Sequence, residues 1–80
     1  MHELGIVFHI VDKVMECVSR EELSEVETIV LEVGDKSPVV PEYLTYCYPA
    51  AVDGTMLEQT ELRIESVSGE GFFLKEIVAR

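Results

Sequence analysis

The chain has 80 residues, enough for one small domain with a single hydrophobic core. Six lysine and arginine residues stand against sixteen aspartate and glutamate residues, so the formal net charge is −10. Such an acidic surface repels nucleic acid and anionic membranes, and the sequence has no apolar run long enough to span a bilayer. We therefore expect no nucleic-acid partner and no membrane partner.

The first three residues, Met1, His2 and Glu3, form the candidate metal site. The α-amine of Met1, the deprotonated backbone nitrogen of His2 and its imidazole Nδ1 can close a five-membered and a six-membered chelate ring. Three coplanar nitrogens suit Ni(II) or Cu(II), whereas zinc prefers tetrahedral ligand sets. Glu3 or a donor from a partner protein would fill the fourth position. These residues alone do not distinguish nickel from copper. They fit equally well the first turn of a helix that binds no metal, where Glu3 suits the positive end of the helix dipole.

The next segment predicts a helix over residues 4–18 with one broad buried face, because its apolar residues recur with spacings of three and four. His9 falls on the opposite, solvated side. It lies about 10.5 Å along the helix from His2, too far to share one metal ion. The residues expected in the buried face are Leu4, Val7, Val11, Val14 and Val18, widened by Phe8, Ile10, Met15 and Cys17.

A strand over residues 26–33 and a second helix, beginning at Pro41 and ending before Gly54, are predicted next. Pro49 inside this helix removes a backbone hydrogen bond and should cause a kink. The side chains expected toward the core are Ile29, Leu31 and Val33 from the strand and Val40, Leu44, Cys47 and Ala51 from the helix. The nearby tyrosines either pack at the edge of the core or form a surface for a partner: Tyr43, Tyr46 and Tyr48.

Residues 61–65 and 72–78 are predicted to form two further strands. The short connection Ser68–Gly71 between them is typical of an antiparallel hairpin. The whole order predicts an α/β (α+β) domain, in which two helices pack on one face of a three-stranded mixed β-sheet in the order α-β-α-β-β.

The last predicted strand needs a bulge. Phe72 and Leu74 share one side, but Ile77 falls out of that phase. An extra residue near Lys75 would return Ile77 to the core side. Arg63 and Lys75 should then lie near glutamates on the polar face of the sheet.

Cys17 and Cys47 are the only cysteines, and neither belongs to a CxxC pair. Two reduced thiols in a cytoplasmic protein are the preferred interpretation, with a disulfide between them as the alternative. No basic segment precedes the apolar opening, so no signal peptide is expected. No phosphate-binding glycine loop or nucleophile elbow is present either, so we expect the chain not to be an enzyme.

Four segments resemble the HypA/HybF family of hydrogenase nickel-incorporation proteins: MHELGIVFHIVDKVMECV, VETIVLEVGDKSPVVPEYLTYCYPAAVDGT, TELRIESV and GEGFFLKEIVAR. The resemblance implies one nickel-binding domain over residues 1–80, with Ni(II) held by Met1, His2 and Glu3. It also implies the hydrogenase maturation GTPase and the hydrogenase large subunit as partners. The family normally carries a zinc-binding insertion with two CxxC pairs, where this chain has only residues 67–71 and no cysteine. We therefore expect no zinc.

The function predicted on these grounds is a nickel metallochaperone for maturation of nickel-iron hydrogenase, with urease as a second recipient. The alternative is a metal-independent protein-interaction module that retains the fold without the zinc region. A homodimer is a further expectation, because a domain of this size gains stability from association.

Overall fold

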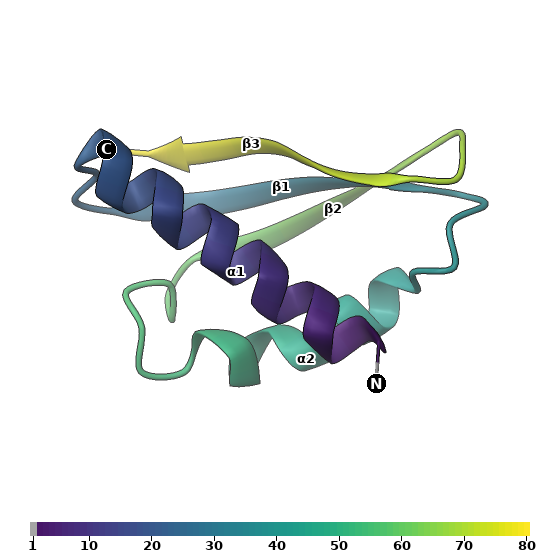
Figure 1. Cartoon of the computed structure of the whole chain (residues 1–80), viewed down its shortest axis with the longest axis horizontal. Helices are drawn as coiled ribbons and strands as arrows, with labels where there is room; N and C mark the ends of the chain where they lie inside the picture. The colour runs from purple at the N-terminus through teal and green to yellow at the C-terminus, as the bar shows by residue number, and fades with distance from the viewer. Residues whose placement is uncertain (1) are drawn as a thin grey trace.

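The computed structural model describes the backbone of residues 2–80 and the side chains from residue 4 onward. The fold consists of two helices and a three-stranded sheet, and Figure 1 shows the helices lying beside the sheet. The elements are α1 (His2–Glu21), β1 (Val26–Gly34), α2 (Pro41–Val52), β2 (Glu61–Val67) and β3 (Phe72–Ala79). Buried residues of both helices form one core cluster with Ile29, Leu31 and Val33 of β1. The predicted element order and fold class are confirmed.

The strand order in the sheet is β2-β1-β3. β1 pairs in parallel with β2, where Thr28 lies opposite Glu61, and antiparallel with β3, where Val33 lies opposite Phe72. The predicted hairpin between β2 and β3 is therefore wrong. These two strands occupy opposite edges of the sheet, and the connection 68–71 passes the end of β1, which lies between them. In the central position β1 is covered from both sides, and Val30 and Thr28 on its face away from the helices are at most 9% exposed.

The buried face of α1 matches the prediction closely. Four of its predicted core valines are at most 8% exposed, Ile10 is also buried, and Leu4 packs partly buried against the same cluster. His9 is exposed, as predicted, whereas Phe8 is 45% exposed and does not widen the core. Within the described residues, no helix combines the length and the apolar character needed to cross a membrane.

The inner face of α2 holds three of the four predicted residues, together with Tyr48 and Val52. Val40 is the exception, with 38% of its surface exposed. It precedes the helix with extended dihedral angles, φ −100° and ψ 114°, so the periodicity of the helix does not reach it. Pro49 lies inside α2, and the kink that we expect there stays a prediction.

The bulge predicted in β3 is present at Lys75. Val30 and Leu31 of β1 lie opposite Glu76 and Leu74, so the pairing skips the residue between them. The isoleucine that follows Glu76 then packs against the core, as expected. The skipped lysine points to the polar side, where its Nζ lies 2.9 Å from a carboxylate oxygen of β2 and 3.7 Å from one of β1.

The end of β1 is bound by hydrogen bonds to the connection between β2 and β3. The N–H of Gly34 donates to the carbonyl of Gly71 at 2.7 Å, and the N–H of Lys36 donates to the carbonyl of Gly69 at 2.8 Å. In return, the N–H of Gly69 donates to Oδ1 of Asp35 at 3.1 Å. These bonds fasten the connection between the two edge strands to the end of β1.

Candidate metal site

The predicted ligands fall at the limit of the described structure. Met1 lies outside the described residues, and so do the side chains of His2 and Glu3. The backbone of His2 and Glu3 forms the start of α1. Because the first four N–H groups of a helix have no intrahelical acceptor, a metal that takes the backbone nitrogen of His2 would break no helical hydrogen bond.

Two electrostatic effects meet at the start of α1. The positive end of the helix dipole favours an amidate or carboxylate anion there, by roughly 0.3–1 kcal/mol, and opposes a bare cation by a similar amount. The net charge of −10 attracts a divalent cation from a distance. For comparison, complete structural zinc sites bind their metal with roughly 10–16 kcal/mol at pH 7. The donor set therefore decides whether metal binds, and the helix dipole is a small correction.

The core anchors the start of α1 firmly. Leu4 packs partly buried against the core cluster, and Val7 is only 2% exposed. Figure 1 shows this end of α1 beside α2, and the two helices pack against each other. Ligands at the first turn would therefore project from a fixed base rather than from a loose tail.

His9 lies in a shallow groove between α1 and β3. Ile10 and Lys13 line the groove from the helix and residues 72–74 line it from the strand, and the groove encloses about 470 Å³. Among the described residues, no three or more histidine, cysteine, aspartate or glutamate side chains stand together as a metal-binding group.

Both cysteines are free, so the alternative of a disulfide between them is wrong. Cys47 is buried in the core cluster and acts as a small apolar residue, as predicted. Cys17 is partly buried at the side of α1 that faces β3.

Sequence reasoning missed a buried polar network beneath α2. The hydroxyl of Tyr48 donates to the carbonyl of Thr60 at 3.0 Å, and Oγ1 of Thr60 donates to the carbonyl of Val26 at 2.6 Å. Burial raises the pKa of Tyr48 to about 12. The network joins α2, the start of β2 and the start of β1, so its role is structural. Only Tyr48 lies in an apolar stretch, whereas Thr60 stands among polar residues, so no local signal marked the pair.

Comparison with known proteins assigns this chain to a class of proteins and to a family within it. The sequence model described as "Hydrogenase/urease nickel incorporation, metallochaperone, hypA" matches residues 1–72. This class consists of metallochaperones, which confirms the prediction that the chain is not an enzyme. The chain belongs to the HypA family, as its sequence segments indicated.

Curated relatives agree with this assignment. The "Hydrogenase maturation factor HypA" of Geobacter sulfurreducens is 37% identical over 71 residues, which cover 89% of this chain and 62% of that protein. The protein of the same name from Rhizobium leguminosarum bv. viciae is 32% identical over 74 residues, which cover 92% of this chain and 66% of that protein. The chain thus spans less than two thirds of the length of these relatives.

A solved structure supports the fold independently. The solution structure of the Ni metallochaperone HypA from Helicobacter pylori superposes with a TM-score of 0.73 and covers 98% of this chain and 86% of that chain. The sequence identity in this comparison is 11%, so the likeness concerns the fold alone.

Proposed function

We propose that the chain is a nickel metallochaperone that serves the maturation of nickel-iron hydrogenase and carries Ni(II) at Met1, His2 and Glu3. The observation that carries this proposal is the family match, which begins at residue 1 and includes all three residues. The backbone adds support, because α1 starts at His2 and leaves the amide nitrogens of its first turn without helical acceptors.

Each residue has a defined chemical role in the proposal. Met1 supplies the α-amine, His2 supplies its amide nitrogen and Nδ1, and Glu3 supplies a carboxylate or backbone donor for the fourth position. A planar nitrogen set holds nickel or copper, and affinity alone favours copper. Metal supply and partner proteins therefore select nickel. A weak fourth ligand that a partner can replace suits a protein that hands its metal on.

The proposed partners are the hydrogenase maturation GTPase and the hydrogenase large subunit, with urease as a second recipient. We place this exchange in the cytoplasm, in keeping with two free thiols. A homodimer is compatible with the proposal and is not required by it.

We propose further that residues 1–80 act as one domain that needs no zinc. The connection at residues 67–71, where the family's zinc insertion would lie, contains no cysteine. Backbone hydrogen bonds from Gly34 and Lys36 close this connection directly onto the end of β1. The nickel site lies on a different element, at the start of α1, and uses no residue of the connection.

The test is a Ni(II) titration of the untagged protein beside a version whose α-amine is acetylated. The two proteins share every side chain and differ only in whether the amine of Met1 can bind metal. We expect one-to-one binding with a square-planar absorbance spectrum, lost on acetylation and in His2→Ala. His9→Ala is the matched control, because this exposed histidine on the same helix should leave binding unchanged. Equal or absent binding in both versions would refute the site and favour the metal-independent interaction module.

A further inference from the structure

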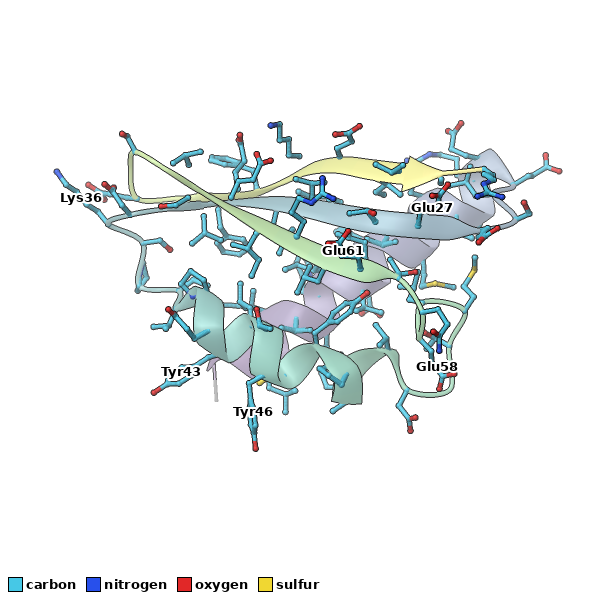
Figure 2. The ribbon with its side chains drawn as sticks, turned by 180° about the vertical axis from the view of Figure 1, so that it is seen from behind. Glu27, Lys36, Tyr43, Tyr46, Glu58 and Glu61 are labelled. Carbon is cyan, nitrogen blue, oxygen red and sulfur yellow. The ribbon has the colours of Figure 1, made fainter. Side chains whose placement is uncertain are left out.

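Beyond Glu42 in its first turn, α2 carries no charge, although the protein is strongly acidic. Residues 43–52 contain no acidic or basic side chain, although 28% of the whole chain is charged. Tyr43 is 57% exposed and Tyr46 is 84% exposed. The two lie three residues apart on one side of the helix, and Figure 2 shows both projecting from α2 away from the sheet.

The contrast with α1 is informative. The solvent side of α1 carries alternating charges, as expected for a surface helix: Asp12, Lys13, Glu16 and Arg20. α2 buries its opposite face in the core just as α1 does, yet its solvent side presents Tyr43, Tyr46, Pro49 and Ala50. We call these four residues the tyrosine face. Two exposed tyrosines with Glu42 as the one charged residue of their helix match the composition of the centre of a protein interface, which is rich in tyrosine and poor in charge.

The segment that carries the tyrosine face is acidic. From residue 37 to residue 62 the chain contains four carboxylates and no lysine, arginine or histidine. Glu42 stands in the first turn of α2, and Asp53 and Glu58 lie just beyond its end. Figure 2 shows Glu58 on the loop that follows α2. An aromatic centre flanked by the carboxylates of its own segment fits a partner of the opposite charge.

We propose that the tyrosine face docks a partner protein whose surface offers an apolar pocket ringed by lysine or arginine. The pocket would receive Tyr46, the most exposed aromatic side chain of the described residues, and the basic ring would face Glu42, Asp53 and Glu58. A second copy of this chain is the wrong occupant, because it would bring two acidic rims and two net charges of −10 together.

The tyrosine face lies close to the start of α1, which carries the proposed metal site. The start of α1 lies beside α2 in Figure 1, so a partner on the tyrosine face would stand next to the amino-terminal residues. A donor atom of that partner could then take the fourth position at the metal. This consequence rests on the proposed nickel site, whereas docking itself does not.

The experiment measures binding of the metal-free protein to the purified hydrogenase maturation GTPase and to the hydrogenase large subunit, by calorimetry at two salt concentrations. We expect at least one of them to bind. The double variant Tyr43→Ala, Tyr46→Ala should weaken that binding at least about 20-fold. The matched control is Phe73→Ala, which removes a 61% exposed aromatic side chain from β3 and should change affinity by less than about threefold. Binding should also weaken as salt rises, and Glu42→Lys should slow association.

Three results would overturn the docking proposal: binding by neither protein, equal loss in the Phe73 control, or self-association in sedimentation that the tyrosine variant abolishes. A nickel titration of the tyrosine variant separates this proposal from the proposed function. The variant changes only exposed side chains, so it should fold and bind nickel like the parent protein. If the tyrosine variant loses docking but binds nickel like the parent protein, the docking proposal is supported. If neither the parent protein nor the variant binds nickel, the proposed metal site is refuted and the docking proposal is not.

Discussion

Replacing Gly34 with alanine would place a methyl group where two backbone segments meet. The added carbon would lie 2.6 Å from the carbonyl carbon of Gly69 and 2.9 Å from the carbonyl oxygen of Gly71, and closer still to the carbonyl oxygen of Gly69. Real side chains do not approach backbone atoms this closely, so the connection between β2 and β3 would have to move. Gly34 is also buried, which leaves the methyl group no other direction.

The cost follows from two effects. Forcing an extra methyl group into a packed site costs about 1–3 kcal/mol. Moving the connection would also weaken the hydrogen bonds from Gly34 to Gly71 and from Lys36 to Gly69, each worth about 0.5–1.5 kcal/mol. Reduced freedom of the unfolded chain returns about 0.4–1 kcal/mol. We therefore expect Gly34→Ala to lower the free energy of unfolding by about 2–4 kcal/mol, out of a total of about 4–12 kcal/mol for a domain of this size.

Urea denaturation followed by circular dichroism measures this loss. The control is Gly5→Ala, because an added carbon at that exposed position in α1 meets nothing within 4 Å. Alanine is the better helix former, so this variant should gain about 0.5–1 kcal/mol. The same substitution thus has opposite signs at the two positions. A Gly34→Ala protein that unfolds at the same urea concentration as the parent would refute the close approach of the two segments.

Three further predictions concern titration and reactivity. Nickel affinity should fall as pH drops through about 6.5, because His2 must be neutral to bind metal, and an affinity that stays constant to about pH 5 would argue against His2. Burial raises the pKa of Tyr48 to about 12 from its ordinary 10.0, so unfolding releases its proton more easily and stability should decline from about pH 10 to about pH 12. Tyr48→Phe should flatten that decline and, through the lost bond to Thr60, cost about 1 kcal/mol at neutral pH. A thiol reagent should modify Cys17 well before the buried Cys47, and equal rates would contradict their places in the fold.

The candidate metal site could be predicted further than most sites, because its geometry is covalent. The amine of Met1 and the amide and imidazole nitrogens of His2 belong to two consecutive residues, so their chelate rings need no tertiary structure. The bond between Tyr48 and Thr60 is different. It joins residues 12 positions apart, and only the packing of α2 against the start of β2 brings them together. No local pattern marks that pair.

Helical periodicity predicted the centre of each buried face and failed at its margins. The valines of α1 lie in the middle of the apolar stripe, so any neighbour on that side buries them. Phe8 lies on the flank, where burial depends on the neighbouring elements, and it is 45% exposed. Tyr46 and Tyr48 show the same limit, because both are tyrosines of one helix, yet one is 84% exposed and the other 9%.

The order of strands could have been predicted from burial rather than from the length of connections. Neighbouring strands lie about 4.8 Å apart, so β2 and β3 are separated by about 10 Å across β1. Four extended residues reach about 13 Å, so a short connection allows either a hairpin or a passage across β1. The composition of the strands distinguishes the two. Val30 is 3% exposed and Thr28 is 9% exposed, although both face away from the helices, and only a central strand gains such cover from both neighbours. β2 alternates glutamate and arginine with apolar residues, and β3 carries Lys75 and Glu76 in its middle, so both strands have the charged residues typical of an edge.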